Sequence, residues 1–308
     1  MPKHYIILNP IAGRGASFSA LEQIERKLTG YGLEVEIVQT SKMGQAVELA
    51  YQASKQSVDV VIAAGGDGTS NEVINGLMRA KREGIDIPAM GVIAIGRGND
   101  FAYSMDVPTE LEENLQVLAN GYRHRIDIGH VVVDNGDGRY FGNCIGVGFD
   151  AEVGFVAVKL SPLSGFLNYI IAAILTDFIY FKAPRINLYY GDEKREMHSL
   201  MVSVMNGIRL GGGFYMTPES INDDGYFDLC IVANPNRFRV LTLLPHFMKG
   251  TQISQKEVEI VQSASVNIVA IEGSLPAHVD GETLCTDGRD ITVELLPQQI
   301  ELICREPS

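Results

Sequence analysis

Residues 65–71 read GGDGTSN, and three of the seven are glycines around Asp67. The apolar run VDVVIAA comes directly before them and predicts a buried strand that ends in this loop. Glycine permits positive φ and lets backbone N–H groups approach a ligand closely. The helix expected to begin at Thr69 would add unpaired N–H groups and the positive end of its dipole. A glycine loop at a helix start is typical of a phosphate-binding site.

Asp67 is unexpected in such a loop, because a carboxylate repels phosphate unless a cation lies between them. Mg²⁺ bound to the phosphates of ATP would supply that cation. The glycine loop and the aspartate together therefore indicate a metal–nucleotide site. A tight turn in which Asp67 serves only as a cap is the alternative.

The first 125 residues alternate between strand and helix patterns, which predicts an α/β domain with a doubly wound parallel sheet. Capping boxes are expected at Thr69 with Glu72 and at Thr109 with Glu112. Strands are expected at 4–10, 33–40, 58–65 and 90–96, and helices at 18–30, 44–56, 69–80 and 109–121.

Three of these strands end in unusual loops, at 9–15, 65–71 and 96–100. Ligands of doubly wound sheets bind at the carboxyl ends of the strands, so all three loops should lie on one rim. The sequence contains neither a GxxxxGK[ST] phosphate loop nor the protein-kinase motifs. GRGASF, after the first strand, does not fit the dinucleotide pattern GxGxxG.

After residue 125 the pattern changes to strands at short spacing with Asp-Gly turns, which predicts an antiparallel β-sandwich over 126–294. Residues 125–148 are expected to form two strands around an Asn-Gly/Asp-Gly turn. Residues 185–207 are expected to form a second hairpin. Helical segments are expected before residue 182 and at 237–250.

Composition excludes several classes of protein. The 308 residues carry a net charge of −13, which argues against nucleic acid and gives no general attraction to anionic lipid. Four widely spaced cysteines and an N-terminus that enters a strand directly indicate a cytoplasmic protein without a signal peptide. The apolar segment 165–181 contains Asn168 and Asp177, and it is too short to span a bilayer. It is expected to be a packed helix; the alternative is a helix that touches a membrane or lines an apolar groove.

The motifs NPIAG (9–13), GGDGTSNEVINGL (65–77), GRGNDFA (96–102) and VDGE (279–282) together resemble the diacylglycerol kinase catalytic family. The similarity is greatest to its soluble bacterial lipid kinases, which include the YegS type. The resemblance covers essentially the whole chain. It implies an N-terminal, NAD-kinase-like ATP domain over 1–125, completed by 295–308, and a C-terminal β-sandwich, with the active site in the cleft between them.

The resemblance also implies roles for particular residues. Glu282 matches the general base, Asp280 lies beside it, and Asp67 serves Mg²⁺. A structural Mg²⁺ would bind Asp224 and the carbonyls of Ile221 and Tyr226. ATP would contact Asn9, Pro10, Gly13, Thr40, Gly65, Gly66, Asp67, Gly68, Thr69, Ser70, Asn71, Arg97, Asn99 and Asp100.

Each of these roles has a simpler alternative. Asp280-Gly281 could be an ordinary hairpin turn with Glu282 in solvent, and residues 221–226 could be a turn without metal. Arg97 stands where the family has threonine or serine. It could hold a phosphate in bidentate fashion, pair with an acid or point to solvent.

The implied reaction is transfer of the ATP γ-phosphate to a lipid hydroxyl at a membrane surface, with diacylglycerol the first expectation and phosphatidic acid its product. An NAD kinase and a non-catalytic nucleotide or lipid sensor are the alternatives. No nucleic-acid partner is expected, and a homodimer is an alternative to a monomer.

Overall fold

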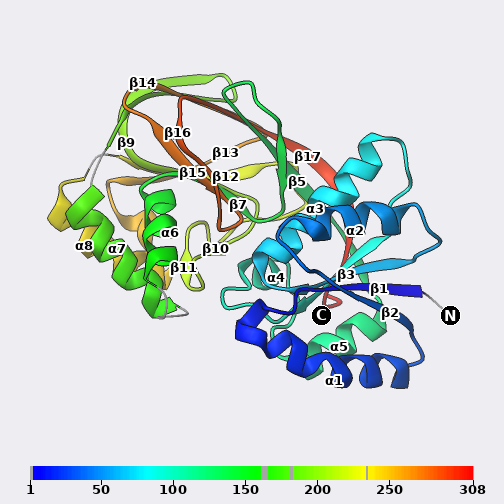
Figure 1. The fold of residues 1–308 in the computed structure, drawn as a ribbon. Helices are drawn as coiled ribbons and strands as arrows, with labels where there is room; N and C mark the ends of the chain where they lie inside the picture. The colour runs from blue at the N-terminus through cyan, green and yellow to red at the C-terminus, as the bar shows by residue number, and fades with distance from the viewer. Residues whose placement is uncertain (1–2, 161–165, 181–182, 234, 308) are drawn as a thin grey trace. The chain divides into compact units, whose positions relative to one another are not determined.

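The computed structural model describes residues 3–160, 166–180, 183–233 and 235–307 (Figure 1). The chain divides into two compact units, residues 1–126 with 298–308 (unit 1) and residues 127–297 (unit 2). The two junctions fall inside long strands, β5 (Arg123–Val133) and β17 (Asp290–Ile303), so the C-terminal end of the chain returns to unit 1.

Unit 1 contains a parallel sheet of the order β4-β3-β1-β2, formed by Ala89–Ala94, Val60–Gly65, Lys3–Leu8 and Glu34–Gln39. The last part of β17 joins it beside β4, where Leu302 pairs in parallel with Met90. The strand ends are aligned, since Leu8 lies opposite both Gln39 and Ala64.

Helices cover both faces of this sheet. α1 (Ala16–Gly30) and α5 (Leu111–Asn120) bury Ile24, Leu28, Leu115 and Leu118 in one core with the strands. α2 (Gln45–Ser54) and α3 (Asp67–Arg82) pack against each other and against β1 and β3 on the other face (Figure 1). The predicted doubly wound α/β architecture is confirmed. Two short helices, η1 (Ala12–Gly15) and α4 (Asp100–Ser104), follow strand ends.

Both predicted capping boxes are wrong. α3 begins two residues earlier than expected, at Asp67, and the Glu72 carboxylate accepts the N–H groups of Gly44 (2.8 Å) and Ala46 (2.9 Å). Glu72 therefore caps the start of α2, a neighbouring helix, because it lies one turn inside α3 and cannot reach the N-terminus of its own helix.

At α5 the cap residue is Glu110, whose side chain makes no capping hydrogen bond. Glu112 instead forms an ion pair with Lys27 of α1. A capping box depends on where a helix begins, and both helices begin two residues from the expected position, α3 earlier and α5 later.

Unit 2 is an antiparallel β-sandwich, as predicted. One layer has the order β16-β15-β7-β9-β12-β13, formed by Glu282–Gly288, Leu275–Val279, Cys144–Gly148, Glu193–Met205, Phe227–Ala233 and Val258–Ser263. The other contains β8 (Arg185–Tyr190), β14 (Ser265–Glu272), β17, β5 and β6 (Arg139–Phe141). β9 is long enough to pair in both, with β7 at one end and β8 at the other.

The segment 125–148 forms three strands instead of the two expected. β5 turns at Asp134 and Asn135, both with left-handed backbone, and pairs with the short β6 before β7 begins. The Asp134 carboxylate accepts the N–H groups of Arg289 (3.0 Å) and Asp290 (2.9 Å) and so joins this turn to the start of β17. The hairpin at 185–207 is confirmed as β8 and β9.

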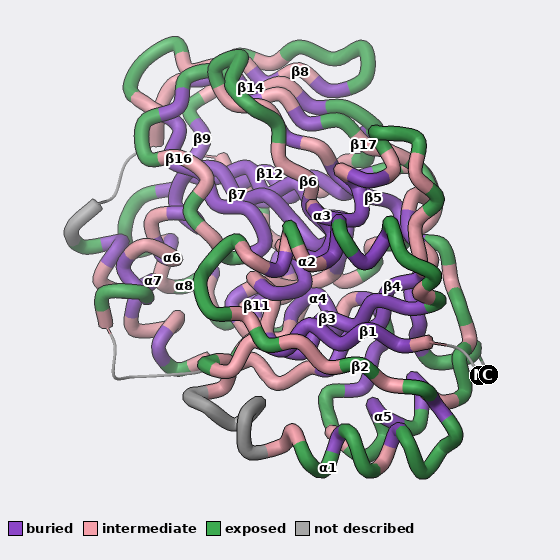
Figure 2. The backbone as a smooth tube through the Cα atoms, turned by 45° about the vertical axis from the view of Figure 1, so that its right-hand side comes forward, coloured by how far each residue is buried: buried purple, intermediate pink, exposed green. Residues whose placement is uncertain are grey.

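Three helices pack beside the sandwich: α6 (Phe149–Lys159), α7 (Phe166–Tyr180) and α8 (Arg237–Lys249), the last followed by η2 (Gln252–Ser254). They share a core with β7, β9 and β12 that is distinct from the core between the layers. Figure 2 shows β7 and β12 almost entirely buried, whereas β14 and β16 of unit 2 also carry intermediate and exposed residues. Within the described ranges, no helix has the length and apolar character needed to cross a bilayer.

Candidate active site

The ends of the parallel strands in unit 1 bring the three glycine-containing loops to one rim. Backbone hydrogen bonds continue past the strands, from Asn9 N to Ala64 O (3.0 Å) and from Thr40 N to Leu8 O (2.9 Å). Ile95 N likewise donates to Gly65 O (2.9 Å). The first residues of each loop are therefore held in place by the sheet itself, at the edge where ligands of this architecture bind.

GGDGTSN is a strand-to-helix junction, because only Gly66 separates β3 from α3. A Cβ on Gly66 would lie 3.1 Å from the Cα of Gly96, and a Cβ on Gly65 would lie 2.3 Å from Thr69 Oγ1. The expected positive φ is not found at either glycine, and Gly66 has φ −106°. Glycine is needed here for space, since side chains would separate β3 from α3 and from the β4 loop.

Asn9 connects the NPIAG motif to the start of α3. Its amide nitrogen donates to Thr69 Oγ1 (3.2 Å), and its amide oxygen accepts the N–H of Ile11 (3.3 Å). Pro10 follows, and Gly13 has a positive φ of 58° within η1. This network fixes the first loop beside the helix terminus whose N–H groups can bind an anion.

Two carboxylates, those of Asp67 and Asp100, lie beside Gly98. A Cβ on Gly98 would be 3.0 Å from Asp67 Oδ2 and 3.3 Å from Asp100 Oδ2. Asp67 Oδ1 accepts the N–H of Phe101 (2.9 Å), and Asp100 is buried. Two acids side by side, one at the start of α3 and one at the start of α4, fit a hard divalent cation, which favours oxygen ligands.

The GRGND loop is closed by Asn99, which has left-handed backbone (φ 52°). Its Oδ1 accepts the N–H of Gly96 (2.9 Å), and its Nδ2 donates to the Gly96 carbonyl (3.2 Å). Arg97 is exposed at the tip of this loop and forms no ion pair within the part of the chain that the structure describes. Its guanidinium therefore stays available for an anion.

The other residues predicted to contact the nucleotide lie in α3 or after β2. Thr69, Ser70 and Asn71 are buried in the first turns of α3. Asn71 accepts hydrogen bonds from the Asn75 amide through its carbonyl (2.8 Å) and its Oδ1 (3.2 Å). Thr40 is half-buried after β2. Direct contact of these side chains with ATP remains a prediction.

In unit 2, Asp280 and Gly281 form the two-residue turn between β15 and β16, and both have positive φ. The Asp280 carboxylate is buried and accepts three backbone N–H groups, those of Gly142 (3.1 Å), Asn143 (3.0 Å) and Cys144 (2.9 Å). The turn is therefore fixed to the loop before β7, and Asp280 positions the residues that follow it.

Glu282, the predicted base, is the first residue of β16 and is half-buried. Its carboxylate forms an ion pair with the guanidinium of Arg139 on β6. Glu282 is thus held by a side chain and not simply solvated. The ion pair orients the carboxylate, and a substrate hydroxyl would have to compete with the guanidinium for it.

The predicted metal loop lies before β12. Ile221, Asp224 and Tyr226 are all exposed, and Asp224 Oδ1 accepts the N–H of Tyr226 (2.9 Å). The Asp228 side chain is buried nearby, and one of its carboxylate oxygens, Oδ2, has no hydrogen-bond partner within the described part of the chain. Burial raises the pKa of Asp228, and the charge of Asp224 raises it further. Excess negative charge of this kind fits a cation, although no cluster of three or more candidate metal ligands occurs in the described ranges.

Asp127 supports the same loop and was not identified from the sequence. It is fully buried, its Oδ2 accepts the N–H of Gly225 (2.8 Å), and its own N–H donates to the Asn222 carbonyl (2.7 Å). In the sequence RIDIG, residues 125–129, Asp127 looks like an ordinary polar residue of an alternating strand. The pattern therefore did not indicate its role.

A second group missed by the sequence is Asp150, Ser203 and His278, all buried in unit 2. The Ser203 hydroxyl donates to Asp150 Oδ2, and His278 Nε2 lies 4.0 Å from the same oxygen. Burial raises the pKa of Asp150, which His278 opposes. Gly146 leaves room for the group, since a Cβ there would lie 2.3 Å from Asp150 Oδ2 and 2.3 Å from His278 Nε2.

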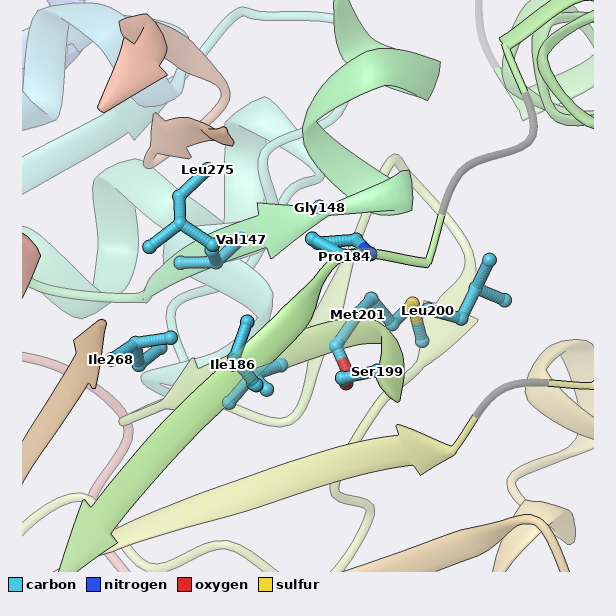
Figure 3. Close-up of a pocket in the computed structure, with 10 residues that line it drawn as sticks. Val147, Gly148, Pro184, Ile186, Ser199, Leu200, Met201, Ile268 and Leu275 are labelled. Atoms are coloured by element: carbon cyan, nitrogen blue, oxygen red, sulfur yellow. The ribbon is translucent and has the colours of Figure 1, made fainter. Parts of the chain in front are cut away.

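Between the layers of unit 2 lies a small cavity lined mainly by apolar side chains such as Val147, Ile186 and Leu275 (Figure 3). The space open to the centre of a water molecule is about 10 Å³, about enough for one water. It cannot hold an acyl chain. The glycine run at 209–214 does not line this cavity. It packs against α7, since a Cβ on Gly213 would lie 2.7 Å from the Phe166 ring.

Comparison with known proteins identifies the family. The family model described as "Diacylglycerol kinase catalytic domain" matches residues 3–131, and "YegS C-terminal NAD kinase beta sandwich-like domain" matches residues 143–304. The chain belongs to the diacylglycerol kinase catalytic-domain family. This confirms the resemblance inferred from the motifs and supports a kinase activity.

Relatives match over most of their length. A protein named "Diacylglycerol kinase" from Staphylococcus saprophyticus is 30% identical over 90% of this chain and 88% of its own. A Bacillus subtilis protein of the same name is 30% identical over 92% and 90%. A Chromohalobacter salexigens protein named "Probable lipid kinase YegS-like" is 30% identical over 90% and 86%.

Solved structures support the fold. The crystal structure of a diacylglycerol kinase from Bacillus anthracis has a TM-score of 0.73 at 23% identity and covers 98% of this chain and 97% of its own. Yeast NADH kinase complexed with NADH has a TM-score of 0.53 at 13% identity, with coverage of 99% and 84%. The predicted NAD-kinase-like architecture is thereby confirmed.

Proposed function

We propose that the protein is an ATP-dependent lipid kinase that phosphorylates diacylglycerol to phosphatidic acid. The observation that carries the proposal is the pair of carboxylates, Asp67 at the start of α3 and Asp100 at the start of α4, which lie beside Gly98. Glycine contacts and helix N–H groups suit phosphate, and the two acids suit the Mg²⁺ that accompanies ATP.

Asp67 and Asp100 would hold the Mg²⁺, and the N–H groups of the α3 terminus would bind phosphate oxygens. Bound there, Mg²⁺ would neutralise charge on the triphosphate. Asn9 and Asn99 keep the neighbouring loops in place through the hydrogen bonds described above. Arg97, exposed and without an ion pair among the described residues, would contact the triphosphate in place of the family's threonine or serine.

In the reaction, the oxygen of the acceptor hydroxyl forms a bond with the γ-phosphorus, and the bond from that phosphorus to the bridging oxygen of ADP breaks. The proton of the hydroxyl passes to the Glu282 carboxylate, which acts as general base. Arg139 would orient Glu282 before the substrate arrives and would have to give up part of its ion pair as the proton moves.

The test is one assay with labelled ATP and Mg²⁺, in which lipid hydroxyls are presented in mixed micelles beside NAD. Label in phosphatidic acid is the expected result. Label in another phospholipid or in a sphingoid base would retain the mechanism and change the acceptor. Label in NADP would move the protein to the NAD kinases, whose fold it shares. Transfer to none of these acceptors, by protein that binds ATP, would favour a sensor.

A further inference from the structure

Helix α7 of unit 2 has an apolar face that nothing in the described structure covers. One side of the helix packs in the core through Ala172, Ala173 and Thr176, which are fully buried or nearly so. The opposite side carries Leu167, Ile171, Ile174 and Phe178, at the spacing of one helix face. A helix that is apolar on all sides requires a partner for its second face.

The exposed face continues onto the two neighbouring helices. Asn168 Nδ2 donates to the Ala157 carbonyl (2.9 Å), which places the start of α7 beside the end of α6. Arg237 Nη1 donates to the Phe178 carbonyl (3.4 Å), which places the start of α8 beside the end of α7. Figure 1 shows the three helices side by side. The apolar stripe consists of Val158, Leu167, Ile174, Phe178 and Phe238, which are 76, 60, 38, 58 and 81% exposed.

The charge of these helices differs from that of the chain. The whole chain has 38 acidic residues against 25 lysines and arginines, whereas α6, α7 and α8 have three against four. Two of the three acids, Asp150 and Asp177, are buried. The exposed cations include Lys159 and Arg237, one beside each end of the stripe.

We infer that this stripe docks the protein on the surface of an anionic lipid bilayer. Large apolar side chains flanked by cations are the features of an interfacial helix, which enters the boundary between headgroups and acyl chains. A second copy of the chain fits less well. With cations at both ends, either orientation of a paired stripe would bring like charges together. The inference rests on the proposed function, because a lipid kinase must reach a substrate in a membrane.

The first experiment measures co-sedimentation of the full chain with phosphatidylcholine vesicles, with and without phosphatidylglycerol. Phe178→Gln and Phe238→Gln should each weaken binding about tenfold, because each removes a large apolar side chain from the interface. Met43→Gln is the matched control, since Met43 is 89% exposed in unit 1, outside the stripe, and should change binding less than about twofold.

The cations are tested separately. Lys159→Gln and Arg237→Gln should each weaken binding to phosphatidylglycerol-containing vesicles about fivefold and leave binding to pure phosphatidylcholine unchanged. Loss on both vesicle types would contradict the assigned role of these charges.

The chain contains no tryptophan, so a single introduced tryptophan reports on its own surroundings. Phe238→Trp should shift its emission to the blue on addition of anionic vesicles and be quenched by brominated acyl chains. Met43→Trp should do neither. Such a blue shift and quenching would show that the side chain at position 238 enters the bilayer. A residue that only stabilises the fold would give neither signal.

The inference fails if wild-type protein does not bind anionic vesicles or if the phenylalanine variants bind as tightly as wild type. It also fails if sedimentation velocity shows a dimer that these variants dissociate. A water-soluble, short-chain diacylglycerol separates this failure from that of the proposed function. Its phosphorylation without vesicle binding would overturn the docking surface alone. Vesicle binding through the stripe without phosphorylation of any acceptor would overturn the kinase proposal alone.

Discussion

Asp67 Oδ1 accepts a 2.9 Å hydrogen bond from the backbone N–H of Phe101, 34 residues further along the chain. The bond joins the first residue of α3 to the start of α4, so the loops after β3 and β4 are held together by an acid that also faces the rim. The same side chain therefore has a structural role through one oxygen, while Oδ2 lies beside Gly98 and Asp100.

These two roles can be separated by substitution. Asp67→Asn retains an acceptor for Phe101 but removes the charge, so it should keep the fold and lower kcat by at least about 10²-fold at saturating Mg²⁺. Asp67→Ala should be equally inactive and also less stable by about 1 kcal/mol, because the N–H of Phe101 loses its partner. Steady-state kinetics and urea denaturation measure the two effects. The exposed Asp86→Asn is the control, and activity retained in Asp67→Asn would remove Asp67 from the metal site.

Glu282 has a clear kinetic prediction. Glu282→Gln should lower kcat by about 10²–10⁴-fold with little change in the affinity for ATP, because a general base acts in the transition state. Arg139→Gln should lower kcat less, about tenfold, since it removes only the partner that orients the base. A two- or threefold effect of Glu282→Gln would show that the residue merely begins a strand.

Asp280 is predicted to matter for stability. Its carboxylate is the acceptor for three buried N–H groups, so Asp280→Ala should lower the free energy of unfolding by about 3 kcal/mol. Asp280→Asn preserves one oxygen acceptor and should cost about half as much. Thermal and urea unfolding measure both. If either variant is as stable as wild type yet inactive, Asp280 contacts the substrate directly.

The sequence predicted the architecture well because strand and helix patterns and hairpin turns can each be read from a short stretch of sequence. Uninterrupted apolar strands such as Val60–Gly65, alternating with amphipathic helices, indicate a covered parallel sheet, and the Asp280-Gly281 pair indicates a hairpin. The glycines of GGDGTSN also identified the rim correctly. Their physical reason differs from the expected one, because Gly66 is required by contact with Gly96, 30 residues away, and not by positive φ.

Features that depend on long-range packing were not predictable from a local pattern. Glu72 has the spacing of a cap for its own helix, yet it caps α2 because that helix start lies beside it. Asp127 and the group of Asp150, Ser203 and His278 consist of single polar residues within apolar strands or helices. Only the tertiary fold brings their partners together, so no spacing in the sequence indicates them.

The loop at 221–226 predicts a response to metal removal. If Mg²⁺ binds at Asp224, a chelator should lower the Tm of wild-type protein by a few degrees, because loss of a ligand that binds only the folded state removes its stabilisation. Asp224→Asn should have the lower Tm already and should not respond to chelator. Asp223→Asn, next to it, is the control. Equal chelator effects on wild type and Asp224→Asn would place the stabilising metal elsewhere.

Asp177 of α7 gives a prediction for pH. The side chain is buried, and neither carboxylate oxygen has a hydrogen-bond partner among the residues that the structure describes. Burial raises the pKa of Asp177, an effect that the charge of Arg237 opposes. Because the folded pKa lies above the unfolded value, the native state holds the proton more tightly. The stability that the protonated Asp177 contributes to folding is fully present at a pH below about 3.9, the ordinary pKa of aspartate. That stability is lost as the pH rises through the pKa of Asp177 in the folded state.

Asp177→Asn removes this titration. At pH 8 the variant should be more stable than wild type by about 1 kcal/mol, because it no longer buries an unpaired charge. The difference should shrink toward a constant value as the pH falls to about 3, where the wild-type carboxyl is protonated in both states. Urea denaturation across this range measures the difference, with the exposed Asp192→Asn as control. A difference that stays constant with pH, or that grows on acidification, would show that Asp177 is satisfied as a carboxylate, since only a group with a raised folded pKa loses stability as the pH rises.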